Sequence, residues 1–258
     1  MQLDSTILRS GNSVTSRLVQ FTFVFGVWLF WYASARFGWI SPLALPAPDA
    51  VWREFIELLS TGAFAKDLFV TMLEVAIAFA ISTCAGLGLG YLIATSNWRV
   101  RVFEPLLSSL NSIPAVMFVP LFILLFGLGI TSKIVMGVAT GFFPIILSTI
   151  AGISNIDPTY FKVARSMGAT RKQIFRCVIL PGALPVILTG LRMGFIVAFL
   201  SILGAEAIGS YAGLGHRIVE SVEMLAMPRM YAFIAFAVLI AAALNVLLQF
   251  AERKGQWE

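Results

Sequence analysis

The sequence predicts an all-α, polytopic membrane protein with about six transmembrane helices. Apolar residues make up 59% of the 258 residues. Charged residues make up only 12%, whereas soluble domains average about 25%. Apolar runs of roughly 20 residues, long enough to cross a bilayer as a helix, recur along the whole chain. These runs are continuous rather than short and alternating, which argues against a transmembrane β-barrel.

The apolar runs define six expected spans. They cover residues 18–36, 68–95, 103–127, 132–152, 182–204 and 230–250. The first run follows Arg9 and Arg17 and ends in small residues at 33–35, a pattern also found at signal-peptide cleavage sites. Its length and its bulky aromatic residues favour a retained membrane anchor. Cleavage is the alternative, and it would leave five spans.

A short amphipathic helix is expected between the first and second spans. Three prolines keep the start of this connector extended, and Asp49 is placed to cap the helix. Its apolar residues recur at i, i+4, i+7 and i+8, on one face. They are Val51, Phe55, Leu58 and Leu59. We therefore expect a helix lying on the outer membrane surface rather than a seventh span.

Several spans carry signals for close helix packing. Three glycine pairs have the spacing that places two small residues on one helix face. The pairs are Gly86 and Gly90, Gly137 and Gly141, and Gly190 and Gly194. The third span also contains three prolines, at 105, 114 and 120. Because prolines free backbone carbonyls that only protein or water can satisfy, this span is expected to face protein or a pathway.

Basic residues predict the orientation of the chain. Most of them lie in one of two alternating classes of connection, which the positive-inside rule places in the cytoplasm together with both termini. The cytoplasmic group comprises Arg9, Arg17, Arg99, Arg101, Lys162, Arg165, Arg171, Lys172, Arg176, Arg253 and Lys254. The net charge of +5 therefore records orientation and does not indicate a nucleic-acid partner.

Residues 157–181 are expected to form two short helices joined by a glycine bend. Asp157 caps the first helix, and Gly168 ends it in the left-handed conformation. Thr170 and Gln173 match a capping box that starts the second helix. That helix is expected to end near residue 180, before the proline that opens the next span.

The side chains of this segment are both basic and apolar, which leaves two interpretations open. The segment could be a basic loop held against anionic lipid, or a docking surface for a soluble partner. Its sequence resembles the EAA loop of the type I ABC importer permeases. Residues 164–168 (ARSMG), the following nine residues and then 178–181 (VILP) keep that loop's spacing. In the family, this loop docks into a groove on the ATPase subunit.

The resemblance covers roughly residues 40–250. SIPAVMFVPLFILLFGLGITSK is similar to the family's proline-rich third span, and AEAIGSYAGLG matches the branch that carries nitrate, bicarbonate, taurine and alkanesulfonates. The chain departs from the family at Lys162 and Val163, where Glu and Ala are usual. It also departs at Asn111-Ser112 and Glu74, where the branch often has Arg-Pro and Arg. An aromatic acid or a pyrimidine-like solute is therefore kept as an alternative to a small anion.

The resemblance implies the fold, partners and location of this chain. Residues 1–66 are expected to be an anchor and connector, 67–252 the permease core with its coupling loop at 157–181, and 253–258 a cytoplasmic tail. The implied complex is a homodimer in the bacterial inner membrane, with two ATPase subunits that bind ATP and Mg and a periplasmic or lipid-anchored solute-binding protein. The residues implied in ATPase coupling are Lys162, Val163, Ala164, Arg165, Met167, Gly168, Arg171, Leu180 and Pro181.

A substrate pathway is predicted from polar and aromatic residues in the spans, because polar groups in lipid are costly and usually line a pathway or pair. The candidates are Asn111, Ser112, Met117, Phe118, Phe142, Phe143, Arg192 and Glu206. Plain packing is the alternative for the aromatic residues and Met117. A structural cap on the outward loop is the alternative for Glu206, and a salt bridge or snorkelling for Arg192.

Other classes of protein are disfavoured. The chain lacks a GxxxxGK[ST] sequence, so ATP hydrolysis is expected on another subunit. Its single histidine and two cysteines provide no metal cluster, no cofactor site and no disulfide framework. The spans contain no Ser-His or paired-Asp arrangement of the kind that an enzyme embedded in the membrane would need. An ion-coupled secondary transporter is the serious rival, but the inverted repeats typical of that class are not found.

Overall fold

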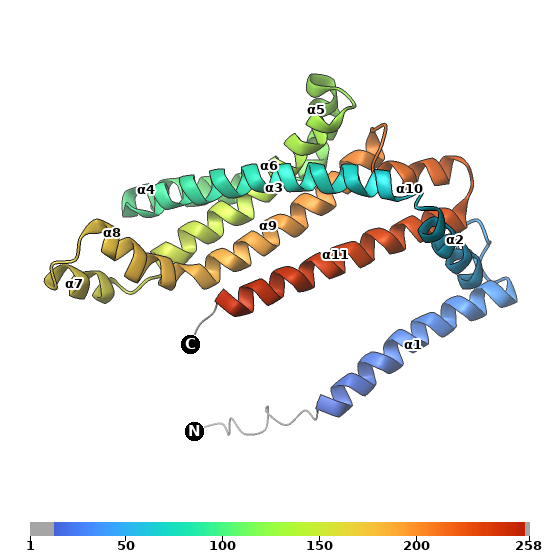
Figure 1. Cartoon of the computed structure of the whole chain (residues 1–258), viewed down its shortest axis with the longest axis horizontal. Helices are drawn as coiled ribbons and strands as arrows, with labels where there is room; N and C mark the ends of the chain where they lie inside the picture. The colour runs from blue at the N-terminus through green and yellow to red at the C-terminus, as the bar shows by residue number, and fades with distance from the viewer. Residues whose placement is uncertain (1–12, 256–258) are drawn as a thin grey trace.

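The computed structural model describes the backbone of residues 13–255 and the side chains of residues 18–250. Every regular element in this part of the chain is a helix (Figure 1). The long helices are α1 (Ser13–Phe37), α3 (Ala65–Ala94), α6 (Ile130–Ser154), α9 (Leu180–Ile208) and α11 (Met227–Gly255). All five are long and apolar enough to cross a membrane. The predicted all-α membrane class is confirmed.

Shorter elements connect these helices. They are α2 (Pro48–Thr61), α4 (Asn97–Asn111), a 3₁₀ turn (Ala115–Phe118), α5 (Val119–Phe126), α7 (Pro158–Ser166), α8 (Arg171–Ile174), a π-helical turn (Phe175–Ile179) and α10 (Leu214–Glu223). In Figure 1, α7 and α8 lie at one end of the bundle, and α2 and α10 lie at the other. We call these the α7 end and the α10 end.

The centre of the bundle is α6, which packs against both α3 and α9. The predicted glycine pairs lie at these contacts. A Cβ atom on Gly86 of α3 would lie 2.7 Å from Cγ2 of Ile145 on α6. On Gly194 of α9, it would lie 2.8 Å from the carbonyl oxygen of Gly141 on α6. The close approach that the sequence predicted therefore occurs within one protomer.

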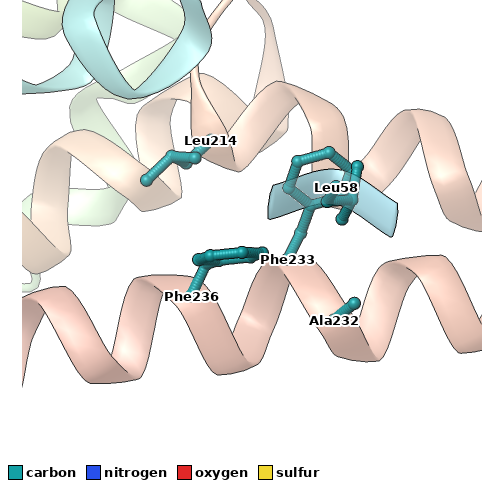
Figure 2. Packing of buried hydrophobic residues seen from close by; sticks show 5 residues of the cluster. All are labelled: Leu58, Leu214, Ala232, Phe233 and Phe236. Carbon is teal, nitrogen blue, oxygen red and sulfur yellow. The ribbon is translucent and has the colours of Figure 1, made fainter. Parts of the chain in front are cut away.

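A second core lies at the α10 end, where α2 and α10 cover α11 (Figure 2). Leu58 of α2 and Leu214 of α10 are buried against α11 together with Ala232, Phe233 and Phe236. Fully burying a side chain such as Leu58 stabilises the fold by about 1.5–3 kcal/mol. This cluster attaches the connector helix to the bundle.

The structure corrects two details of the predicted connector. Val51 and Leu58 are buried as expected, but Leu59 is half exposed and does not belong to the packed face. Asp49 does not cap α2. Ala47 occupies the N-cap position without a capping side chain, and Asp49 lies in the first turn, where its carboxylate pairs with Arg53 at 2.7 Å. The helix starts earlier than predicted because Pro48 is well suited to a first-turn position.

The predicted third span, 103–127, is not one helix. It is α4 followed by the 3₁₀ turn and α5, and the two parts are bent by 75°. The break falls just before Pro114, because a residue that precedes proline is disfavoured in the α conformation. In Figure 1, α5 turns away from the bundle. No residue of α4 is buried within one protomer. By contrast, Val119 of α5 is buried together with Met136 of α6 and Ala205 of α9. The expectation that this segment faces protein or a pathway is therefore met around α5, whereas α4 finds no protein cover within one chain.

Candidate functional site

Residues 157–181 fold as their capping residues predict. The backbone N–H of Thr159 donates a 2.7 Å hydrogen bond to the Asp157 carboxylate, and this bond holds the pKa of that carboxyl below its ordinary value. Gly168 has a φ of +74°, in the left-handed region that glycine adopts without strain. The capping box of Thr170 and Gln173 is formed in both directions. The helix, bend and helix of the prediction are confirmed.

The second helix does not end near Leu180, so that expectation is wrong. The helical path runs unbroken from Arg171 to Ile208. Pro181 has no N–H to donate to the turn before it, and the wider π turn accommodates the missing bond. The N–H of Leu180 reaches back to the carbonyl of Phe175. The bend segment is therefore joined to the span α9 by continuous helix.

The predicted coupling residues lie on the surface of this segment. Lys162, Val163, Arg165, Met167, Gly168, Arg171, Leu180 and Pro181 are exposed, and Ala164 is half-buried. Among the apolar and aromatic side chains here, Met167 is 81% exposed and Tyr160 is 64% exposed. Apolar side chains beside cations are typical of a surface that another protein covers.

A groove of about 580 Å³ opens between α4, the 3₁₀ turn, α6 and α9. Of the predicted pathway residues, Asn111, Phe118 and Phe143 line it. Thr140 and Ser201 also line it and were missed. Both are polar residues within apolar spans, a signal that could have found them. None of the residues that line this groove is charged.

The other predicted pathway residues lie elsewhere. Ser112 donates its hydroxyl to the carbonyl of Ser108 at 3.0 Å, and Met117 projects from the 3₁₀ turn with 70% of its surface exposed. Phe142 packs edge-on against Phe143, with ring centroids 5.5 Å apart. Arg192 is half-buried on α9. The structure does not bring Arg192 to the groove.

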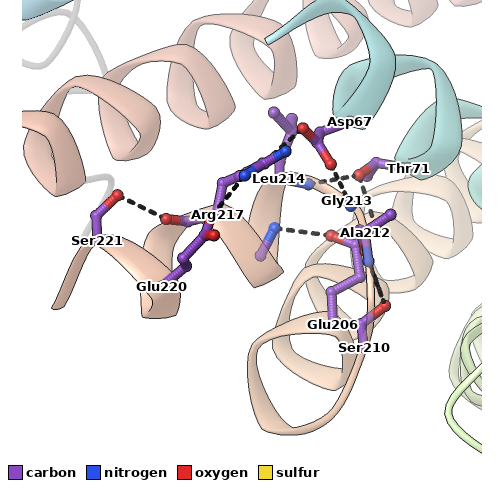
Figure 3. A network of polar contacts seen from close by, with 11 residues as sticks. Asp67, Thr71, Glu206, Ser210, Ala212, Gly213, Leu214, Arg217, Glu220 and Ser221 are labelled. Carbon is purple, nitrogen blue, oxygen red and sulfur yellow. Dashed lines mark hydrogen bonds and ion pairs between the residues drawn. The ribbon is translucent and has the colours of Figure 1, made fainter. Parts of the chain in front are cut away.

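Glu206 is fully buried and holds the loop between α9 and α10 (residues 209–213; Figure 3). Its carboxylate accepts a 2.7 Å hydrogen bond from the hydroxyl of Thr71 on α3 and a 2.8 Å bond from the N–H of Gly215. The N–H of Leu214 in turn donates to the Thr71 hydroxyl oxygen at 3.0 Å. These bonds favour the structural alternative for Glu206 over a place in the pathway.

Asp67 extends the same network (Figure 3). Its carboxylate accepts hydrogen bonds from the N–H of Gly213 at 3.0 Å and from Nε of Arg217 at 2.7 Å. Arg217 also pairs with Glu220 at 2.6 Å. The hydrogen bonds to Asp67 and Glu220 raise the pKa of Arg217. Together with Thr71 and Glu206, Asp67 fixes the α9–α10 loop against the end of α3.

Two buried ionisable residues lie close to this network, and sequence reasoning gave neither a role. Lys133, at the start of α6, has no exposed surface and donates hydrogen bonds to the carbonyls of Leu128 and Gly209. Glu74 on α3 is equally buried. The presence of Glu74 in a predicted span was a usable signal for a buried role, whereas Lys133 lies near the start of a span, just after the glycines at 127 and 129. Among the described residues, no group of three or more potential metal ligands is found.

Comparison with known proteins decides the class. Residues 86–253 match the family model of the binding-protein-dependent transport system inner membrane component. The chain belongs to this family. It is therefore a multi-pass inner-membrane permease component of an ABC importer, and ATP hydrolysis resides on a separate subunit. The resemblance seen in the EAA-like segment is confirmed.

Three curated relatives are similar over most of the chain. The taurine transport system permease TauC of Escherichia coli is 31% identical and covers 87% of this chain and 83% of its own. The putative aliphatic sulfonates permease SsuC of Bacillus subtilis is 31% identical, with coverages of 87% and 81%. The formylaminopyrimidine permease ThiX of Halalkalibacterium halodurans is 33% identical, with coverages of 72% and 74%.

The fold is also that of a solved ABC transporter. An inward-facing structure of the MetNI methionine ABC transporter matches with a TM-score of 0.62 and 20% identity. The match covers 73% of this chain and 94% of that one. At this identity the likeness supports the permease fold and nothing finer.

Proposed function

We propose that this permease converts movement of its ATPase subunits into movement of its spans through residues 157–181. The observation that carries this proposal is the continuous helical path from Arg171 to Ile208, preceded by a bend at Gly168 with a φ of +74°. Helix α7 is the part that docks, and α8 with the π turn leads into the span. A physically connected element with two positions can carry a movement from one site to another.

The docking surface combines apolar and basic side chains. Val163 and Met167 are 52% and 81% exposed on or just beyond α7, and they fit the groove of a protein partner. Arg165, Arg171 and Lys172 are exposed around them and would pair with acidic groups at its rim. Such rim charges set register and association rate more than affinity.

The α7 end is proposed to be cytoplasmic and the α10 end periplasmic. The N-terminal end of α1 and the C-terminal end of α11 both point to the side of the molecule that carries α7 (Figure 1). This is expected for a chain whose termini are both cytoplasmic. The α10 end then faces a solute-binding protein.

A cross-linking experiment tests the docking surface and the orientation together. Cysteines are placed at Met167 and at Met224, which are 81% and 70% exposed, in a chain without its natural cysteines. Each is then coupled to a photoactivated cross-linker in the assembled complex. We expect position 167 to cross-link to the ATPase and position 224 not to do so. An ATPase adduct from position 224 alone would reverse the orientation and overturn the proposal.

A homodimer is proposed because the groove is incomplete within one chain. One side of it is formed by α4 and the 3₁₀ turn, and no residue of α4 is buried. The segment that joins them includes Pro114, and irregular backbone at membrane depth needs cover from protein or a water-filled cavity. A second copy that packs against α4 and α5 would complete the groove and cover the irregular backbone. Native mass measurement of the solubilised complex should give two permease copies for two ATPases. A single copy would contradict the homodimer.

The proposed substrate is a small organosulfonate, a nitrate-like ion or another small anion. Support comes from the relatives whose names describe taurine and aliphatic sulfonate transport, each 31% identical to this chain. Taurine carries an ammonium and a sulfonate and has no net charge, so it suits a groove lined by uncharged residues. Because the groove contributes no charge, selection among anions would rest on the solute-binding protein.

A pyrimidine-like solute or an aromatic acid is the second candidate. This candidate is favoured by the 33% identity to a formylaminopyrimidine permease. It is also favoured by the aromatic rings of Phe118 and Phe143, which line the groove. Ring faces stack on aromatic side chains at centroid separations of about 4.5–7 Å. The test is ATP hydrolysis by the reconstituted importer, with its solute-binding protein, against a panel of both compound classes. Uptake that depends on a proton or sodium gradient and not on ATP would instead support a secondary transporter.

A further inference from the structure

Two glutamates and a lysine from three helices form a buried cluster at the α10 end. Glu74 of α3, Lys133 of α6 and Glu206 of α9 have no exposed surface. Glu74 interacts electrostatically with both of the others. None of the three lines the groove or belongs to the coupling segment, so the proposed function assigns them no role.

The hydrogen bonding within this cluster is unequal. Both oxygens of Glu206 accept hydrogen bonds, one from the Thr71 hydroxyl at 2.7 Å and one from the Gly215 N–H at 2.8 Å. The Lys133 ammonium donates to two backbone carbonyls. Neither oxygen of Glu74 has a hydrogen-bond donor as partner. A buried carboxylate without any donor is expensive, since it loses its hydration and receives nothing in return.

The charges of the cluster do not balance if both glutamates are ionised. Two carboxylates and one ammonium leave one uncompensated negative charge. The neighbouring Arg217 does not supply the missing cation, because it pairs with Asp67 and Glu220. An uncompensated buried charge destabilises a fold strongly. If one of the two glutamates retains its proton, the cluster carries no uncompensated charge.

The geometry places that proton on Glu74. Glu206 is already stabilised as a carboxylate by two donors, and a carboxylate accepts further hydrogen bonds. Glu74 lacks any donor and interacts with Glu206, whose carboxylate can accept an O–H from Glu74. We propose that Glu74 is a neutral carboxylic acid that donates its proton to a hydrogen bond with the Glu206 carboxylate. Hydrogen bonds from an acid to a carboxylate are among the strong ones.

Glu74 is then a positioning residue for the α10 end of the bundle. Its O–H fixes Glu206, which holds Gly215 and so the α9–α10 loop. Lys133 holds Gly209 of that loop and also Leu128, two residues after α5. The acid pair and the lysine therefore join the turn after α5 to the α9–α10 loop.

Infrared spectroscopy of the full chain in lipid nanodiscs tests the proposal. At neutral pH we expect a deuterium-sensitive carbonyl band of a protonated carboxylic acid in the wild type. The band should be lost in Glu74→Gln and kept in Glu57→Gln, which changes an exposed glutamate on α2. Glu74→Gln should keep the wild-type melting temperature, because its amide N–H donates in place of the acid. Glu74→Ala, which has no donor, should melt at a lower temperature.

Two results would overturn the proposal. One is a wild-type spectrum without the acid band, which needs no variant to fold. The other is a band that survives Glu74→Gln. If replacing sodium with choline shifts the wild-type carboxylate bands and no acid band is present, a cation neutralises the cluster instead. These spectra do not depend on transport, so they stand or fall separately from the proposed function.

Discussion

The hydroxyl of Thr71 joins two helices that lie far apart in the sequence, donating a 2.7 Å hydrogen bond to the carboxylate of Glu206. The same hydroxyl oxygen accepts the N–H of Leu214. One buried side chain on α3 therefore connects the end of α9 with the start of α10. Asp67 of α3 holds the same loop through the N–H of Gly213, so we expect the position of the loop to depend on both residues.

Replacing Thr71 by valine keeps the shape of the side chain and removes both hydrogen bonds. Each buried partner left without its bond costs about 1–3 kcal/mol. We expect Thr71→Val to lower the melting temperature of the purified permease. Thr95→Val, which removes an exposed hydroxyl at the other end of α3, is the control and should change it little. Equal effects in both variants would show that the Thr71 network contributes nothing special.

Gly213 is predicted to tolerate no side chain. Its φ is +110°, and a Cβ atom there would lie 2.2 Å from Oε1 of Glu206. The Glu206 carboxylate cannot retreat without losing its bonds to Thr71 and Gly215. Gly38→Ala is the matched control, because Gly38 also has a positive φ, +69°, but has open space for a Cβ. That change should cost only about 1–2 kcal/mol.

Expression and monodispersity in detergent compare these two glycine variants. Gly213→Ala should fold poorly or melt at a much lower temperature than Gly38→Ala. If the two behave alike, backbone conformation alone matters and the close contact with Glu206 does not.

The cap of α7 is predicted to weaken in acid. The hydrogen bond from Thr159 lowers the pKa of Asp157, so the folded state binds this proton less readily than the unfolded state. The stabilisation is therefore complete above the ordinary carboxyl pKa of about 4 and is lost as the pH falls through the lower, folded pKa. Hydrogen exchange in the first turn of α7, corrected for its intrinsic rate, should accelerate over that window. Asp157→Asn keeps a capping side chain that does not titrate, and its exchange should lack this acceleration.

The two cysteines predict a labelling pattern. Both are exposed in the single chain, but Cys84 lies within the span α3 and Cys177 lies in the π turn beside α8. A membrane-impermeant maleimide should therefore label Cys177 in inside-out vesicles and leave it unlabelled in right-side-out vesicles. Cys177→Ser, which retains Cys84, should give no label in either. Labelling of Cys177 from outside would contradict the proposed orientation.

Much of the fold was predictable because its signals are local. Apolar runs gave the spans to within a few residues, and Asp157, Gly168 and the Thr170–Gln173 box determine their own backbone conformation. The break before Pro114 was less predictable, since proline can either kink a helix or end it. The unbroken path through Pro181 depends on a π turn, which has no distinctive sequence signature.

The polar network at the α10 end could be predicted only in part. Glu206 is predictable as an ionisable group near a span, but its partner Thr71 lies more than a hundred positions away in the sequence. Lys133 follows a glycine turn and carries a charge, so local sequence suggested an exposed connection. Its burial depends on two backbone carbonyls, those of Leu128 and Gly209, which three-dimensional folding alone brings together.

The account rests on Gly168 transmitting movement from the ATPase, and one comparison of variants tests it most directly. Gly168 and Gly62 both have a positive φ, +74° and +62°, and both have open space for a side chain. A valine at either position therefore introduces similar backbone strain, about 1–2 kcal/mol, but only residue 168 lies in the coupling segment. The measurement is ATP hydrolysis stimulated by loaded solute-binding protein in the reconstituted importer. We predict that Gly168→Val loses the stimulation and the uptake, while Gly62→Val, inserted and assembled to the same extent, retains both. Wild-type stimulation and uptake in Gly168→Val with the ATPase bound would contradict the account.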